Sequence, residues 1–125
     1  MSNIKKVMII DDSEIIGRRL VQLLSLPSLK VFPVAKSFSQ ALEIFPKIKP
    51  DIIVLDFNIP GGNGIELLKK LKKIRPTVKA IMLTNSTAAV YKRKFKESGG
   101  DIFLDKTNDF INITDAVFSL TGSLE

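Results

Sequence analysis

Four short runs of apolar residues, unbroken by any polar residue, constrain the fold of this chain more than any other feature. They cover residues 7–10, 52–55, 80–83 and 102–104. An unbroken run is typical of a parallel strand that helices cover on both faces, because neither side of the strand meets water. A fifth run, residues 29–35, contains Pro33, which cannot donate a hydrogen bond to a neighbouring strand. We therefore expect this strand at an edge of the sheet.

Segments with the apolar spacing of amphipathic helices lie between these runs, so strand and helix alternate along the chain. Their apolar residues are Ile16, Leu20, Leu23 and Leu24, then Phe38, Ala41, Leu42 and Phe45, then Leu67, Leu71 and Ile74, then Ala88, Tyr91 and Phe95. Ser37 and Gln40 have the spacing of a capping box at the start of the second helix, and Gly99 ends the fourth. The last helix is expected over residues 110–120, with Asp109 placed to cap it.

Five β-α units predict an α/β fold of the flavodoxin-like, doubly wound (βα)5 type, with a parallel five-stranded sheet and right-handed crossovers. The strand order 2-1-3-4-5 is favoured because it puts the strand that contains Pro33 at an edge. We expect a single domain over residues 1–125, with its core at about residues 5–121.

The composition excludes several kinds of site. The chain has no cysteine and no histidine, so it has neither a disulfide framework nor a thiolate metal site, and it lacks the commonest general base. The first six residues carry no apolar signal segment, and no apolar run approaches the roughly 18 residues that span a bilayer. We expect a soluble cytoplasmic protein with no membrane partner.

The net charge of +6 comes largely from two predicted helices, at residues 69–75 and 92–96. Such runs are either plain solvated helix faces or a dedicated binding patch, and we favour solvated faces. Charge of this sign alone does not establish a nucleic-acid partner, and we expect no direct nucleic-acid binding by this chain.

Polar residues that can carry chemistry follow four of the predicted strands. Asp11 and Asp12 follow the first strand and Asp56 follows the third, while Thr84 follows the fourth and Lys106 follows the fifth. Because the carboxyl ends of parallel strands share one edge of a sheet, these side chains should converge on one site.

Three carboxylates in one small site require a raised pKa or a bridging cation. Oxygen ligands favour Mg²⁺, for which Asp12 and Asp56 supply carboxylates, while Asp11 holds a metal-bound water and a carbonyl after Asp56 fills another position. The Lys106 ammonium suits a phosphoryl oxygen, and Thr84 brings a hydroxyl to the same edge. An aspartate such as Asp56 is then able to accept a phosphoryl group.

Residues 9–13, 55–64, 83–84 and 103–106 resemble four motifs of the receiver domain of two-component response regulators, the CheY-like superfamily. The resemblance implies that Asp56 is the phosphoacceptor, supplied by a histidine kinase or a phosphotransfer protein. It also implies a Mg²⁺ site made by Asp11, Asp12, Asp56 and the backbone carbonyl of Asn58.

By the same resemblance, Thr84 and Phe103 form a switch pair that remodels the face made by the fourth helix, fifth strand and last helix. A downstream protein would bind that face. We hypothesise that the basic residues on or beside it attract an acidic partner surface; they are Lys92, Arg93, Lys94 and Lys96. The chain would be a phosphoacceptor rather than a classified enzyme, and the resemblance also allows a homodimer.

Three residues depart from the family pattern. Thr107 replaces the proline that often follows the lysine, so no cis peptide bond is expected there. Asn63 replaces an aspartate but still suits a turn. Asn85 is bulkier than the small residue common after the threonine, and we hypothesise that it alters the lifetime of the phosphoryl group.

Other functions fit the sequence less well. A flavodoxin-like flavin carrier needs a phosphate loop after the first strand, where this chain has Asp11, Asp12 and Glu14, and it has no tryptophan to stack on a flavin. A haloacid-dehalogenase-like phosphohydrolase needs a paired-aspartate motif, which residues 56–58 match poorly. The main alternative is a receiver-like docking module that is never phosphorylated.

Overall fold

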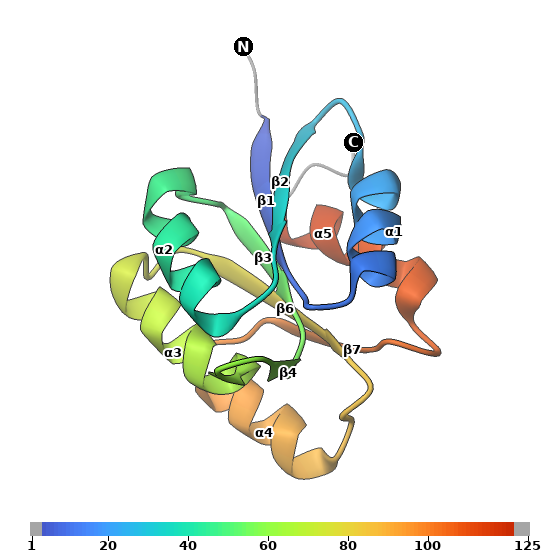
Figure 1. Ribbon diagram of the computed structural model, residues 1–125. Coiled ribbons are helices and arrows are strands. Elements are labelled where there is room, and N and C mark those ends of the chain that lie inside the picture. The colour runs from blue at the N-terminus through green and yellow to red at the C-terminus, as the bar shows by residue number, and fades with distance from the viewer. Residues whose placement is uncertain (1–3, 122–125) are drawn as a thin grey trace.

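A parallel five-stranded sheet forms the centre of the computed structural model, which describes residues 4–121 (Figure 1). The strands in spatial order are β2 (Leu29–Ala35), β1 (Lys5–Ile10), β3 (Ile52–Leu55), β6 (Lys79–Thr84) and β7 (Ile102–Asp105). Every neighbouring pair is parallel. Counted as sheet strands, this is the predicted order 2-1-3-4-5, and the flavodoxin-like fold is confirmed.

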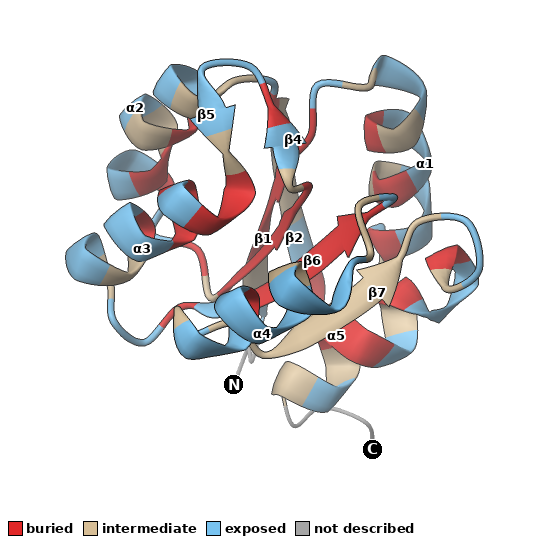
Figure 2. Cartoon of the chain, turned by 90° about the horizontal axis from the view of Figure 1, so that it is seen from below, coloured by how far each residue is buried: buried red, intermediate tan, exposed pale blue. Residues whose placement is uncertain are grey.

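Helices cover both faces of the sheet, and Figure 2 shows its central strands buried between them. One face carries α1 (Glu14–Leu24) and α5 (Ile113–Thr121), and the other carries α2 (Phe38–Ile48), α3 (Gly64–Ile74) and α4 (Ala89–Glu97). Successive strand residues point to opposite faces. Ile9 therefore packs in the core under α1 and α5, whereas Ile10 packs in the core under α2 and α3. This two-sided burial explains the unbroken apolar runs.

The strand with Pro33 lies at the sheet edge, as predicted. Its pairing with β1 runs in register to Met8 and Phe32 and resumes at Ile10 and Ala35. Between these two pairs β2 has two residues and β1 has one, so β2 bulges there. Pro33 is one of the two residues of the bulge. A bulge in an edge strand is a position where the missing N–H of proline removes no ladder hydrogen bond.

Two predicted helix starts differ in detail. Ser37 Oγ accepts from Gln40 N at 3.1 Å, but Gln40 Oε1 accepts from Lys36 N rather than from Ser37 N, so the capping box is only half formed. The predicted helix over residues 110–120 is present, but the prediction that the Asp109 side chain caps it is wrong. That segment begins as the 3₁₀ helix η1 (Phe110–Asn112) before α5, and Asp109 Oδ2 instead accepts from Asp105 N at 2.9 Å.

None of the helices in the part of the chain that the structure describes is long and apolar enough to cross a bilayer.

Candidate phosphoacceptor site

Three carboxylates meet at the carboxyl edge of the two central strands. Asp11 and Asp12 follow β1 and Asp56 follows β3, whose last residues, Ile10 and Leu55, pair directly. One oxygen from each carboxylate lies within 4.8 Å of the others. Asp11 and Asp56 are buried, with 2% and 7% exposure, whereas Asp12 is exposed. The convergence expected from the sequence is therefore present.

Lys106 reaches this cluster from the end of β7. Its Nζ lies 2.9 Å from Asp11 Oδ2 and 2.9 Å from Asp56 Oδ2, and its side chain is only 10% exposed. The Lys106 backbone N–H donates to the carbonyl of Thr84 at 2.9 Å, which fixes the loop after β7 to the end of β6. One ammonium therefore joins two carboxylates that lie 95 and 50 residues away in the chain.

Burial and ion pairing act in opposite directions on the pKa values at this site. Burial raises the pKa of the Asp11 carboxyl, and its hydrogen bonds to Lys106 and the Ser13 N–H offset this only in part. For Lys106, burial favours the neutral amine, but the bonds to Asp56 and Asp11 outweigh it and raise the pKa of the ammonium. Lys106 thus stays charged at neutral pH and can pair with the two buried carboxylates that it contacts.

Asp11 is held by the start of α1. Its Oδ1 accepts from the Ser13 N–H at 2.9 Å, and Ser13 Oγ accepts from Ile16 N at 3.2 Å as the N-cap of the helix. Ser13, rather than either of the two acids before it, caps α1. Both Asp11 oxygens are therefore hydrogen-bonded, one to the helix start and one to Lys106.

The loop after Asp56 is a hairpin that the sequence analysis missed. Strands β4 (Asn58–Ile59) and β5 (Gly62–Asn63) pair antiparallel around Pro60 and Gly61. Gly61 has φ of +92°, so proline followed by this glycine is the signal of a tight turn that could have revealed the hairpin. At Gly64, a Cβ atom would collide with the Asp56 carbonyl oxygen. Glycine at this position therefore lets the end of the hairpin lie close to the end of β3.

Asn58 ties this hairpin to the loop after β6. Its backbone N–H approaches Asp56 Oδ1 at 3.4 Å, and its side-chain amide donates to Ser86 Oγ at 2.8 Å. Ser86 was not among the predicted site residues, because only the tertiary fold brings it to Asn58. The residue expected to contribute a carbonyl to a cation is thus held next to the Asp56 carboxylate.

The expected switch residues lie on neighbouring strands. Thr84 is fully buried at the end of β6, and its Oγ1 accepts from Ser86 N at 3.1 Å. Phe103, on β7, is partly buried and meets the Phe95 ring edge-on at 5.9 Å, while Lys92 Nζ lies 5.8 Å from its centroid. The Phe103 ring therefore contacts two side chains of α4, the Phe95 ring and the Lys92 ammonium.

A second aromatic pair links the site to α4. Phe57, the residue after Asp56, lies against Tyr91 with ring centroids 4.3 Å apart and a 30° angle between the rings. The sequence indicated that Tyr91 lies on the inner side of its helix, but no local pattern identifies Phe57 as its partner.

The departures from the family pattern have clear structural roles. Asn63 Oδ1 accepts from the N–H groups of Ile65 and Glu66 at 3.0 and 2.9 Å, so it caps α3 as an aspartate would. Thr107 Oγ1 donates to Asn85 Oδ1 at 3.1 Å and links the loops after β6 and β7. The described residues contain no cis peptide bond, in agreement with the expectation at Thr107.

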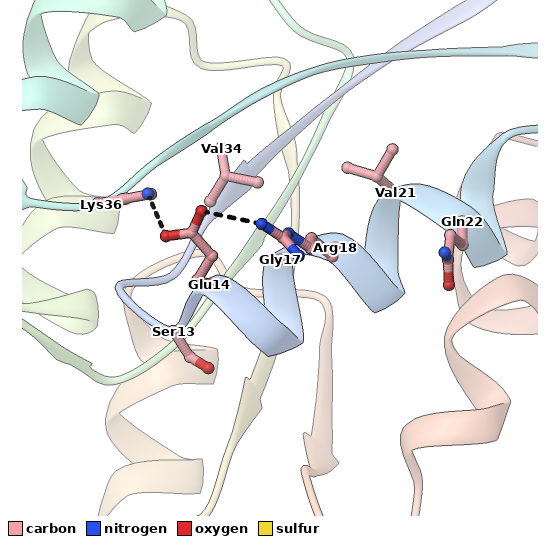
Figure 3. Close-up of a pocket in the computed structure, with 8 residues that line it drawn as sticks. All are labelled: Ser13, Glu14, Gly17, Arg18, Val21, Gln22, Val34 and Lys36. Atoms are coloured by element: carbon pink, nitrogen blue, oxygen red, sulfur yellow. Dashed lines mark hydrogen bonds and ion pairs between the residues drawn. The ribbon is translucent and has the colours of Figure 1, made fainter.

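A cavity of about 520 Å³ lies apart from the carboxylates, between α1 and β2 (Figure 3). Glu14 spans its rim, with Lys36 at 3.0 Å and Arg18 at 3.6 Å. One carboxylate thus pairs with two cations, and these three side chains together leave one net positive formal charge at the rim of the cavity.

The described donors fit a hard divalent cation. They are carboxylate oxygens only, and three acids meet where one ammonium, that of Lys106, contacts two of them. A family model, the response regulator receiver domain, matches residues 7–118. This chain belongs to that family.

Curated relatives include both single receiver domains and longer proteins. Sporulation initiation phosphotransferase F of Bacillus subtilis is 34% identical over 113 residues, covering 90% of this chain and 90% of that protein. The DNA-binding transcriptional activator DevR/DosR of Mycobacterium tuberculosis is 40% identical over 84 residues, or 66% of this chain. The matched part spans 39% of that activator, and 32% of a Carboxydothermus hydrogenoformans protein-glutamate methylesterase.

Solved receiver domains share the fold. The isolated RcsB receiver domain of Salmonella enterica has a TM-score of 0.89 at 21% identity, covering 97% of this chain and 91% of that one. A CheY-like receiver domain of Methanospirillum hungatei has a TM-score of 0.88 at 23% identity, covering 95% and 94%. Receiver domains of this family interact with kinases or phosphotransfer proteins and with downstream effectors.

Proposed function

We propose that this receiver domain is a phosphorylation-dependent switch in which Asp56 accepts a phosphoryl group from a histidine kinase or phosphotransfer protein. The observation that carries the proposal is the buried Asp56 carboxylate, joined by Lys106 to Asp11 at the edge where the central strands end. In the transfer, the phosphorus–nitrogen bond of phosphohistidine breaks and a bond forms from phosphorus to an Asp56 oxygen. The leaving imidazole takes its proton from solvent.

Mg²⁺ is the proposed cofactor. Asp12 and Asp56 would hold it directly, together with the Asn58 backbone carbonyl, and Asp11 would hold it through water. When bound, the ion offsets negative charge on the phosphoryl oxygens. The mutual approach of the three carboxylates to within 4.8 Å supports this assignment.

Lys106 and Thr84 act on the phosphoryl group itself. The Lys106 ammonium exchanges its contact with Asp56 Oδ2 for one with a phosphoryl oxygen, and it keeps its contact with Asp11. The Thr84 hydroxyl, which now accepts from Ser86 N, turns to donate a hydrogen bond to the same group.

The output surface is the face made by α4, β7 and α5. Movement of Thr84 opens space for Phe103 to turn inward, and its ring leaves the Phe95 edge and the Lys92 ammonium. Both partners of Phe103 belong to α4, so the change passes to the surface that binds the downstream protein. We propose that the whole chain works in this way in the cytoplasm, as a phosphoacceptor and not as an enzyme in its own right.

The alternative is a docking module that is never phosphorylated, and intact mass distinguishes the two. Phosphoramidate supplies a phosphorus–nitrogen bond like that of phosphohistidine. We expect one added phosphoryl group with Mg²⁺, and none with a chelator or in Asp56→Asn. A folded parent that gains no phosphoryl group under any condition would support the docking module.

A further inference from the structure

The excess positive charge of this chain lies on two adjacent helices. Helices α3 and α4 contain eight of the nineteen basic residues and two of the thirteen acidic ones. Their net charge of +6 equals that of the entire chain, so the rest of the molecule, with eleven residues of each sign, is neutral. The excess positive charge is therefore concentrated on α3 and α4 and is not spread over the whole surface.

The two helices form one continuous surface. Figures 1 and 2 both show α3 beside α4 on the same face of the sheet, and Figure 2 shows exposed residues on the outer turns of both helices. They touch where the Lys72 side chain passes Gly99, just beyond the end of α4. Lys72 itself is used by the fold, because its Nζ donates to the Val78 carbonyl at 2.6 Å.

Five of the remaining cations are exposed and have no hydrogen bond or ion pair from their side chains within residues 4–121. We call these five residues the basic face: Lys70, Lys73, Arg93, Lys94 and Lys96. Lys69 pairs instead with Glu66, and Lys92 lies over Phe103.

The spacing of these charges weakens the helices that carry them. Lys70 and Lys73 are three residues apart on α3, as are Arg93 and Lys96 on α4, and like charges at this spacing destabilise a helix. The N-cap residue of α4, Ala88, also provides no side-chain cap for the helix. The pattern therefore does not serve the stability of the free chain, and a negatively charged partner would relieve the repulsion.

We propose that the basic face binds an acidic surface of a second protein. A nucleic acid fits less well, since Arg93 is the only guanidinium on α3 and α4, and Tyr91 and Phe95 stack inward rather than presenting rings to bases. The same inward packing leaves α4 without an aromatic anchor for a bilayer. A second copy of this chain fits less well, because its surface outside α3 and α4 has no net negative charge.

This surface goes beyond the proposed output face, because α3 lies outside it. Docking through the basic face needs no phosphoryl group, so it can be tested on the unphosphorylated chain. If docking were not observed, the proposal that Asp56 is phosphorylated would still stand. The two proposals are therefore tested by separate measurements.

The test uses a short poly-glutamate peptide as the acidic probe, with binding followed by calorimetry at moderate salt. The test variant carries Lys70→Glu, Lys73→Glu and Lys96→Glu. The matched control carries Lys30→Glu, Lys47→Glu and Lys79→Glu, three exposed lysines elsewhere that give the same change in net charge. Far-UV circular dichroism checks that both fold.

We expect the test variant to bind poly-glutamate about tenfold or more weakly than the parent, and the control to lose about threefold or less. Equal losses would overturn the proposal, because net charge alone would then explain binding. No binding by the parent would also overturn it. Tighter binding to a DNA duplex of equal charge, or to phosphatidylserine vesicles, would assign the face to a nucleic acid or a membrane instead.

Discussion

The Lys106 ammonium lies 2.9 Å from Asp56 Oδ2 and makes the same contact with Asp11 Oδ2. It is the one cation in contact with these two buried carboxylates among the described residues. The contact places a cation against buried carboxylates. Under the proposed function, the same ammonium is also the donor that meets an incoming phosphoryl oxygen.

Replacing Lys106 by methionine should cost stability. The substitution leaves two buried carboxylates without their cation, which we expect to lower the free energy of unfolding by about 3 kcal/mol in the absence of divalent ions. Urea unfolding measures the change. Lys36→Met provides the control, because Lys36 pairs with Glu14 at an exposed position and should cost less than about 1 kcal/mol. Equal losses in the two variants would contradict the role assigned to Lys106.

Mg²⁺ should stabilise the folded parent. A cation that binds only the folded state adds about 2.7 kcal/mol at a concentration about 100 times its Kd. We expect the thermal midpoint of the parent to rise with Mg²⁺, and that of Asp12→Asn to respond much less. Asp115→Asn removes an exposed acid on α5 and should respond like the parent. If Asp12→Asn responded as fully as the parent, Asp12 would not be a ligand.

Tyr91 should report the state of the site. It is the only tyrosine in a chain without tryptophan, and it stacks on the residue that follows Asp56. We expect its fluorescence to change when beryllofluoride and Mg²⁺ are added together. Phe57→Leu removes the partner ring and should reduce the response. If ¹⁹F NMR showed that beryllofluoride binds but the fluorescence of the parent did not change, α4 would not respond to occupation of the site.

Asp105 should contribute stability that acid removes. Its carboxylate accepts from the N–H of Thr107 at 2.8 Å, and this bond, together with those from Asn108, holds its pKa below the usual 3.8. A carboxyl whose pKa is depressed by folding stabilises the protein above pH 3.8, and that contribution is lost as the pH falls through the folded-state pKa.

Asp105→Asn should therefore unfold at a lower urea concentration than the parent near neutral pH. The gap between the two midpoints should narrow below pH 3.8, where the parent carboxyl becomes protonated. If the gap between the two midpoints widened in acid, the pKa of Asp105 would be raised by folding and not lowered.

The fold was predictable because its main determinant is local. Residues such as Ile9 and Ile10 are buried on opposite faces of the sheet, so each strand is visible as an apolar run. The site was predictable for a related reason, since parallel strands bring their carboxyl ends, and hence Asp11 and Asp56, to one edge.

What the sequence did not reveal depends on partners that no sequence pattern identifies, some of them nearby and others far along the chain. Asp109 is the right residue type to cap a helix, but its carboxylate is taken by the Asp105 N–H. Nothing near Phe57 in the sequence identifies Tyr91 as its stacking partner. The same holds for Asn58 and Ser86, which are 28 residues apart.

The central claim, that Asp56 is the acceptor, is tested most directly by mapping the modified residue. The chain is phosphorylated with acetyl phosphate and Mg²⁺ and then reduced with borohydride, which converts an aspartyl phosphate to homoserine. Peptide mass spectrometry then reads the position. We predict homoserine at position 56 and at no other aspartate. Homoserine at position 11 or 12, or a folded chain that yields none, would contradict the account.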